Sequence, residues 1–510
     1  MVSGLACPFS GHPDTQCSAG PKTEEEISLV GQTVGLSNEA SGNLVHLSAA
    51  DIILILVYFG AVLFVGFRAT RKNKSGADEY LLASRTLTLP MFIATLVSTW
   101  YGGILGVGEF SYRYGISNWV VFGVPYYLFA LIFALFLAKK VRATNLYTIP
   151  DKLEQAYDRK TAVAGGFLTF FLVSPAPYVL MLGILVQLVF GFSLFVSVLL
   201  TTFLTVCYLY AGGFRSDIWV NAFEFIMMFV GFILVVVFAY TKYGGLDFIR
   251  ANVPALHLSW NGGNSWQFIL VWFFIALWTL VDPAFHQRCY AAQDSATAQR
   301  GILLSIPFWF VFDFLTSTAG LYSRAVLPAL AQPTYSYPML AEVVLPSVAK
   351  GLFYIGMLAT IMSSLSSLTL IAAITVGKDI VGRMRHADHQ SPIVQQWTKI
   401  GLIITAVVAI AMALVVPSVV SLWYTIGTCI IPGLLVPVLA SYFDRFKISA
   451  NYAFAAMIAG CGLSTASLVY GHLTSVGGVP SYWFGIEPMY PGLMASVVIW
   501  GVGKWRIPLA

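Results

Sequence analysis

Charge is scarce in this chain of 510 residues, of which only 10% are Asp, Glu, Lys or Arg. A soluble globular domain carries roughly 25% charged residues, so this scarcity excludes an ordinary soluble protein. The alternating ten-residue pattern of an outer-membrane β-barrel is also missing, which excludes that class of membrane protein. Hydrophobic residues make up 58% of the chain. We therefore expect an all-α integral membrane protein.

Cysteine is also scarce, and the six that occur lack the spacing of a metal site: Cys7, Cys17, Cys207, Cys289, Cys429 and Cys461. Four of them fall in or beside apolar segments, where the thiol acts as a small apolar side chain. Cys7 and Cys17 could pair only in an oxidising compartment. The sequence also shows no paired catalytic acids, no set of His and Cys with metal-ligand spacing, and no nucleophile–base arrangement. We therefore do not expect an enzyme.

What the chain has in abundance is apolar runs of about 20 residues or more, each long enough to cross a bilayer as a helix. We predict thirteen spans: 48–68, 87–113, 118–138, 161–191, 193–211, 217–240, 265–287, 301–326, 349–377, 398–417, 419–443, 450–472 and 487–503. The Lys and Arg residues of the connecting segments divide 22 to 6 between the two sides. The positive-inside rule then places the N-terminus outside a plasma membrane and the C-terminus in the cytoplasm.

The polar segment 1–47 contains no apolar run of the kind found in a signal peptide. We expect it to be a flexible extracellular extension. A transmembrane domain over 48–503 and a short cytoplasmic tail over 504–510 complete the predicted organisation.

Two of the predicted spans are interrupted. The second reads "LVSTWYGGILGVGEF" (96–110), with Gly102 and Gly103 at mid-depth, and the seventh reads "LWTLVDPAFHQR" (277–288), with Asp282 and Pro283 inside it. In a bilayer such breaks survive where the freed backbone groups line a protein or water cavity, although a simple kink would explain either one alone. The two lie five helices apart, so spans 2–6 and 7–11 form two inverted sets of five. This pattern is typical of inverted-repeat secondary transporters.

The ninth span contains "ATIMSSLSSLTL" (359–370), with four serines and two threonines in an apolar environment. At 100° per residue, five of the hydroxyls fall within about 160° and form one polar face: Thr360, Ser363, Ser364, Ser366 and Ser367. Close packing of small residues would explain such a face. A sodium site would explain it as well, because hydroxyls and the carbonyls freed at a helix break can together hold a monovalent cation.

Four segments resemble the sodium:solute symporter family: "DEYLLASRTL" (78–87), "YAGGFRSDIWVNAFEF" (210–225), "VDPAFHQRCYAAQD" (281–294) and "ATIMSSLSSL" with the following "KDI" (359–380). The resemblance extends from about residue 50 to 443. It implies a leucine-transporter-like fold and Na⁺-coupled symport of a small polar organic solute by alternating access. It also implies a Na⁺ ion held by the hydroxyls of Ser363 and Ser364 and by the carbonyls of Ser98, Tyr101 and Thr360.

The chain departs from this family at two places. Members with a second sodium site have an Asp after the Trp of the sixth span, where this chain has Asn221, with Glu224 one turn further on. A second ion would therefore depend on Ser366, Ser367, Asn221 and Glu224, and we expect one Na⁺ per transport cycle. Sugar-transporting members have a Gln where this chain has Pro283, which weakens a sugar-binding interpretation.

Candidate solute-binding residues are those at the two breaks, nearby aromatic residues and acids within the spans: Trp100, Tyr101, Gly102, Glu109, Tyr178, Trp278, Asp282 and Trp423. Asp313 is a further acid in the middle of a span. Such a site suits a small polar or zwitterionic solute, or a cation held by ring faces, and the sequence does not choose among them.

Two alternatives to Na⁺-coupled symport stay open. One is proton coupling through Glu224 or Glu109, and the other is a transporter-like membrane sensor, which the lack of a kinase or receiver domain after Ala510 disfavours. We expect membrane lipid and a small solute as partners, no nucleic acid, and a monomer as the functional unit.

Overall fold

The computed structural model describes residues 45–70, 76–388, 391–416, 418–475 and 480–506. Cys7, Cys17, most of the predicted N-terminal extension and the last residues of the predicted tail lie outside these ranges. Within them the backbone is helical apart from turns, loops and one isolated β-bridge. The prediction of an all-α membrane protein is confirmed.

The first half of the described chain consists of α2 (Ala49–Thr70), α3 (Ala77–Leu82), η1 (Ala83–Arg85), α4 (Leu89–Trp100), α5 (Ile104–Tyr114), η2 (Trp119–Gly123), α6 (Val124–Ile132), η3 (Phe133–Leu137), α7 (Ala138–Ala143), α8 (Ile149–Ala156), α9 (Arg159–Leu172), α10 (Ala176–Phe190), α11 (Leu194–Tyr243) and α12 (Leu246–Asn252).

The second half consists of η4 (Ala255–Leu258), α13 (Trp266–Ile275), α14 (Trp278–Val281), α15 (Pro283–Ala291), α16 (Ser295–Val326), η5 (Pro333–Tyr335), α17 (Ser336–Val344), α18 (Ala349–Ile374), η6 (Thr375–Gly382), α19 (Pro392–Val415), α20 (Val419–Ser441), η7 (Asp444–Phe446), α21 (Ala450–Leu473), η8 (Trp483–Gly485) and α22 (Met489–Trp505).

Among the described residues, ten helices are long and apolar enough to cross a membrane, or eleven if the bent pair α4 and α5 counts as one span. Two features separate this number from the predicted thirteen. Helix α11 covers the fifth and sixth predicted spans and carries Gly213 in a non-helical conformation between them (φ 55°). Helix α22, the thirteenth predicted span, has only 17 residues. The count of thirteen stays a prediction.

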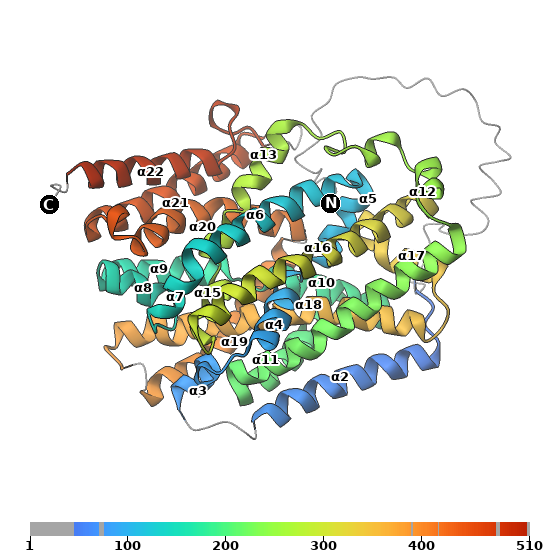
Figure 1. Cartoon of the computed structure of the whole chain (residues 1–510), viewed down its shortest axis with the longest axis horizontal. Coiled ribbons are helices and arrows are strands. Elements are labelled where there is room, and N and C mark those ends of the chain that lie inside the picture. The colour runs from blue at the N-terminus through green and yellow to red at the C-terminus, as the bar shows by residue number, and fades with distance from the viewer. Residues whose placement is uncertain (1–44, 71–75, 389–390, 417, 476–479, 507–510) are drawn as a thin grey trace.

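Helix α18 lies at the centre of the bundle. Every residue from Phe353 to Ser367 is buried, and the helix packs against α2, α4, α10, α11 and α19. Figure 1 shows α18 surrounded by these helices, with α2 along the opposite flank from α21 and α22. Because its polar residues are enclosed on all sides, α18 is an interior element of the protein and does not present its hydroxyls to lipid.

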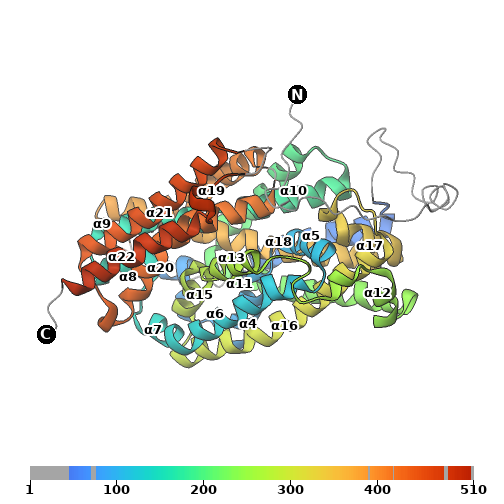
Figure 2. The same ribbon diagram turned by 90° about the horizontal axis from the view of Figure 1, so that it is seen from above.

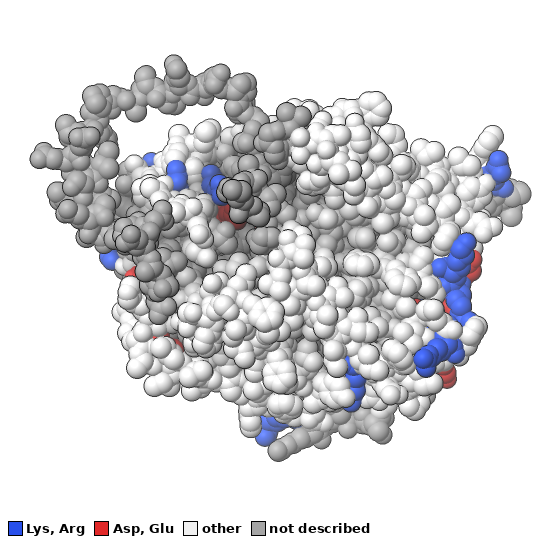
Figure 3. Space-filling model, turned by 180° about the vertical axis from the view of Figure 1, so that it is seen from behind, with Lys and Arg blue, Asp and Glu red and all other residues white. Residues whose placement is uncertain are grey.

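The molecule is elongated, and most long helices run along its longest axis (Figure 1). Two views place α12 and α17 at one end and α8 with the C-terminus at the other (Figures 1 and 2). In Figure 3, Lys and Arg gather along the edge on the C-terminal side, while the middle of that face is almost uncharged. An apolar belt between polar ends is the arrangement that a bilayer requires.

The segments that flank the two interrupted spans are joined directly. A parallel β-bridge pairs Leu87 with Ala292, and the Leu87 N–H donates to the carbonyl of Ala291 (3.1 Å). In return the Gln293 N–H donates to the carbonyl of Leu87 (3.1 Å). The start of α4 and the end of α15 are therefore fixed to each other at one end of the molecule.

Candidate functional site

The first break lies between α4 and α5. The chain leaves helical geometry after Trp100 and resumes it at Ile104, and the two helices differ in direction by 60°. Gly102 and Gly103 supply the small size that this break needs. A Cβ atom on Gly102 would lie 2.0 Å from Ser364 Oγ, and one on Gly103 would lie 2.2 Å from the Trp423 ring. The break therefore packs closely against α18 and α20.

The second break lies between α14 and α15. Asp282 adopts an extended conformation (φ −67°, ψ 117°), and its carboxylate caps α15 by accepting a hydrogen bond from the Ala284 N–H (2.6 Å). Pro283 occupies the first turn of α15, where its missing N–H is tolerated. Sequence and capping chemistry thus explain why the helix restarts at this point.

The hydroxyl face of α18 meets the first break. Ser363 Oγ donates to the carbonyl of Ser98 (2.8 Å) and to that of Thr360 in its own helix (2.9 Å). Ser364 Oγ donates to the carbonyl of Thr99. Of the five residues expected to bind Na⁺, Ser98, Thr360 and Ser363 are thus in direct contact, and Ser364 contacts Thr99, the residue after Ser98. A cluster of neutral hydroxyl and carbonyl oxygens fits a small hard monovalent cation.

The fifth expected ligand, Tyr101, is at the break and its N–H donates to the Ser98 carbonyl (3.3 Å). No contact joins its own carbonyl to the serines of α18 among the described residues. Thr99, which the sequence analysis did not name, lies closer to these serines. Its position three residues before Gly102, in the last turn of α4, is the signal that could have identified it.

One turn further along α18, Ser366 and Ser367 contact a buried ion pair that the sequence analysis missed. Ser366 donates to Asp217 (2.7 Å), and Ser367 donates to the other oxygen of the same carboxylate (2.8 Å). Arg288 approaches Asp217 to 3.6 Å and donates from Nη2 to Ser367 (2.8 Å). Both charged side chains are fully buried.

Thr99 and Asn221 complete this cluster. Arg288 Nη2 also donates to Thr99 Oγ1 (2.7 Å), and Asn221 Nδ2 donates to Ser367 (2.8 Å). Asn221 is therefore close to the serines, as expected. The carboxylate of the cluster is supplied by Asp217, four residues before Asn221, and a helical face that includes Asn221 and Asp217 is the signal that sequence reasoning overlooked.

Glu224, the other expected member of a second ion site, faces a different neighbour. Its Oε1 accepts a hydrogen bond from Tyr58 of α2 (3.2 Å), and no bond joins it to Ser366 or Ser367 within the described chain. Glu109 likewise lies apart from the breaks. It pairs with Arg113 one turn away (3.1 Å) and accepts from Thr334 (3.1 Å).

A cavity of about 130 Å³ lies between the two breaks. Six of the eight expected solute-binding residues line it: Trp100, Tyr101, Tyr178, Trp278, Asp282 and Trp423. Gly103 lines it in place of Gly102, and Glu109 is not among the lining residues. Tyr126 and Trp272, which the sequence analysis did not name, add two more aromatic side chains.

Asp313 of α16 is the second carboxylic acid of the cavity lining. One of its oxygens accepts a hydrogen bond from Tyr101 and the other accepts from Tyr127. Asp313 is an acid within a predicted span, and the structure places it beside the first break through its bond to Tyr101.

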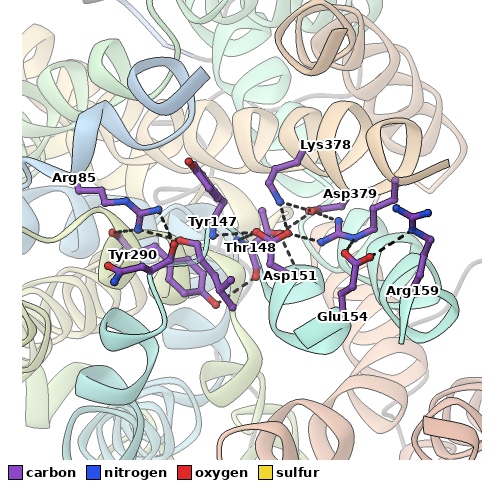
Figure 4. A network of polar contacts seen from close by, with 12 residues as sticks. Arg85, Tyr147, Thr148, Asp151, Glu154, Arg159, Tyr290, Lys378 and Asp379 are labelled. Atoms are coloured by element: carbon purple, nitrogen blue, oxygen red, sulfur yellow. Dashed lines mark hydrogen bonds and ion pairs between the residues drawn. The ribbon is translucent and has the colours of Figure 1, made fainter. Parts of the chain in front are cut away.

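The C-terminal end of α18 is held by a charged network (Figure 4). Lys378 of η6 pairs with Asp151 of α8, and Arg383 pairs with Asp151, with Glu154 (2.8 Å) and with Asp379 (2.5 Å). Burial opposes the charged form of Arg383, but Asp379 and Asp151 outweigh it and raise the pKa of the guanidinium. The network therefore joins the segment that continues α18 to α8 at the end of the bundle.

Known proteins resemble the chain over most of its length. The profile of the sodium:solute symporter family matches residues 80–460. The sodium/pantothenate symporter of Haemophilus influenzae is 25% identical over 474 residues, covering 89% of this chain and 95% of the relative. Sodium/proline symporter 2 of Staphylococcus saprophyticus is 22% identical and covers 89% and 93%.

A solved structure shows the same fold. A Na⁺-coupled sialic acid symporter in a substrate-bound outward-open state superimposes with a TM-score of 0.74 at 16% identity. The superposition covers 91% of this chain and 98% of that one. The match of the family profile to well over half of the sequence, together with the two interrupted helices, identifies the chain as a member of the sodium:solute symporter family.

Proposed function

We propose that this protein imports a small polar organic solute together with Na⁺ by alternating access. The observation that carries the proposal is the position of Ser363, whose hydroxyl lies within hydrogen-bond distance of two carbonyls, one of α18 and one at the break before α5. An ion at this place would join α18 to α4, the first half of an interrupted helix. Binding of Na⁺ would thereby favour one arrangement of the two inverted sets of helices.

The proposed ion ligands are the hydroxyls of Ser363 and Ser364 and the carbonyls of Ser98, Tyr101 and Thr360. The contacts of Ser363 with Ser98 and Thr360 support this set directly. The proposed solute site is the cavity between the breaks, because Tyr101 belongs to both the cavity lining and the proposed ion site. That shared residue supplies a physical link between ion and solute.

The drive available from one ion is sufficient for accumulation. At ~100 mV and a tenfold Na⁺ gradient, entry of one Na⁺ releases roughly 3.7 kcal/mol, enough for about 500-fold solute accumulation. We propose that the N-terminus lies outside the cell and the C-terminus inside. The gathering of Lys and Arg toward the C-terminal end of the molecule supports this orientation.

Gradient-controlled uptake tests the function. The full chain is reconstituted in proteoliposomes, and labelled amino acids, carboxylates, polyols, amines and urea are supplied with an inward gradient of Na⁺, of protons or of neither. We expect accumulation of at least one solute only with the Na⁺ gradient. Accumulation driven by protons alone, and lost in Glu224→Gln, would instead support the proton-coupled alternative.

A further inference from the structure

We infer that the solute carries an ammonium group, so that the cavity takes a small organic cation. This inference rests on the proposed function and chooses among the solute classes that it leaves open. Relatives named for pantothenate and for proline transport different solutes, so family membership does not make the choice. The side chains that line the cavity indicate the class of solute.

The cavity carries carboxylates without a matching base. Asp282 and Asp313 both line it, and none of the described lining residues is Lys, Arg or His. Arg288 is a fully buried guanidinium whose close contacts are with Asp217, Thr99 and Ser367. Neither lining carboxylate takes part in an ion pair within the described chain.

The hydrogen bonds around Asp313 suit its ionised form. The Trp119 N–H can only donate, so at 3.1 Å the oxygen of Tyr127 accepts from it, and the Tyr127 proton points to Asp313. Tyr101 donates to the other carboxylate oxygen, and its own oxygen also lies 3.0 Å from the Thr316 hydroxyl. Both carboxylate oxygens thus accept, as the ionised group requires, and no proton is needed on either.

Asp282 supplies negative charge on the other side of the cavity. One of its oxygens is engaged by the N-terminus of α15, and the residue still lines the cavity. An anion entering this space would meet two carboxylates and no Lys, Arg or His among the described lining residues. A cation would replace water with charge-matched oxygens, which is the favourable way to bury a charge.

Aromatic rings form much of the remaining wall. Nine of the twenty lining residues are aromatic: Trp100, Tyr101, Phe122, Tyr126, Tyr178, Trp272, Trp278, Phe285 and Trp423. Ring faces attract ammonium groups, and Trp does so most strongly. The cavity volume of about 130 Å³ is below the ~300–1,000 Å³ of sites for drug-sized ligands, so the cation is small.

Matched probes test the charge of the solute. Binding to the purified full chain in Na⁺ is followed by tryptophan fluorescence for choline, for its neutral isostere 3,3-dimethyl-1-butanol and for zwitterionic glycine betaine. Ethanolamine and ethylene glycol form a second pair, and propionate serves as the anion. We expect at least one cation to bind tenfold or more tightly than its neutral partner. A neutral, zwitterionic or anionic probe that binds as tightly as the cations would overturn the inference, as would a lack of saturable binding by every cation.

Two variants assign the selectivity. Asp282→Asn keeps a capping side chain for α15 but removes the charge, and we expect the preference for cations to fall at least tenfold. Glu487→Gln is the matched control, because Glu487 also accepts a hydrogen bond from a tyrosine, Tyr424, but does not line the cavity. Its cation preference should equal that of the unaltered protein. An undiminished preference in a folded Asp282→Asn protein would contradict the assignment.

Transport currents give a second, independent measure. The ratio of charge to solute minus the ratio of Na⁺ to solute equals the charge of the solute, whatever the ion stoichiometry. A value near +1 supports the inference, and a value of zero or below overturns it. If transport did not depend on Na⁺ but still selected cations, the proposed Na⁺-coupled function would be contradicted. The inference about the charge of the solute would still hold.

Discussion

At the scale of single residues, two hydroxyls of α18 are expected to determine the apparent affinity for Na⁺. Ser363→Ala removes an oxygen that contacts the Ser98 and Thr360 carbonyls, and Ser364→Ala removes the contact with Thr99. We expect each change to raise the half-saturating Na⁺ concentration at least tenfold, because an ion that has lost a ligand is under-coordinated. Na⁺-dependent uptake at a series of Na⁺ concentrations is the measurement.

Ser305→Ala provides a matched control for this pair. Ser305 is equally buried, but within the part of the chain that the structure describes its hydroxyl donates only to the Gly301 carbonyl of its own helix (2.8 Å). Its Na⁺ dependence should be unchanged. A folded double variant of Ser363 and Ser364 that keeps the original Na⁺ dependence would show that the ion binds elsewhere.

The same residues show what sequence reasoning could reach. The face formed by Ser363, Ser364 and Thr360 follows from helical geometry alone. The part of Ser98 in the same site was implied by the resemblance to the family, and in the structure Ser363 contacts its carbonyl. The pair Asp217–Arg288 could not be found in this way. Asp217 belongs to α11 and Arg288 to α15, so the pair depends on how both helices pack around α18, which the local pattern of neither segment records.

At the scale of elements, the break between α4 and α5 should depend on the absence of a side chain at Gly102. In Gly102→Ala the added methyl would lie 2.0 Å from Ser364 Oγ and 2.7 Å from the Tyr178 ring. We expect the break to move away from α18, at a cost of roughly 1–3 kcal/mol or more in stability, and Na⁺-dependent uptake to be lost. Thermal unfolding with and without Na⁺ separates the two effects.

Gly462→Ala in α21 is the corresponding control, because no atom lies within 4 Å of the position that its methyl would take. Uptake and Na⁺-dependent stabilisation should both persist there.

The sequence predicted both interruptions because Gly-Gly and Asp-Pro are unusual in a membrane helix. It did not predict that α11 would run from Leu194 to Tyr243 with a single non-helical residue at Gly213. This segment also contains a Gly-Gly pair, and such a pair interrupts the second span, so the local sequence does not distinguish the two outcomes.

The charged network at the C-terminal end of α18 is the second element-scale feature with a measurable consequence (Figure 4). Asp151 accepts from Lys378 and Arg383, so Asp151→Asn removes one of the two carboxylates that both buried cations contact, the other being that of Asp379. Removing one member of such a buried cluster costs about 3–5 kcal/mol when it leaves charge uncompensated. We expect α8 to separate more readily from η6, which shifts the protein toward the arrangement open on this side.

Hydrogen exchange of the backbone over 149–156 measures this shift and should become faster in Asp151→Asn. Arg385→Ala is a suitable comparison, because Arg385 follows the network in sequence but packs on the Trp397 ring instead. Exchange over 149–156 should be unaltered by that change. Equal exchange in Asp151→Asn and the unaltered protein would show that the network does not hold this end closed.

At the scale of the whole molecule, the stoichiometry of transport follows from the charge balance around α18. The cluster of Ser366, Ser367 and Asp217 has the oxygen ligands and the carboxylate that a second Na⁺ would need, but it already contains the guanidinium of Arg288. That guanidinium donates to Ser367 and lies 3.6 Å from Asp217. A Na⁺ ion arriving there would meet a fixed positive charge, and at an effective dielectric constant near 20 the repulsion amounts to a few kcal/mol at contact distance.

We therefore expect one Na⁺ per solute, with a Hill coefficient near 1 and a Na⁺-to-solute flux ratio of 1 in proteoliposomes. Arg288→Gln should leave the Asp217 carboxylate uncompensated and allow a second ion to take its place, so the flux ratio should rise toward 2. The double variant Asp217→Asn with Arg288→Gln should return it to 1 and provides the control for folding, because it removes both buried charges together. A Hill coefficient near 2 in the unaltered protein would contradict the expectation. If Glu224→Gln then lowered that Hill coefficient to 1, Glu224 would have left Tyr58 to supply the carboxylate of the second site. If Asp217→Asn alone lowered it to 1, Arg288 would have moved aside when the second ion bound.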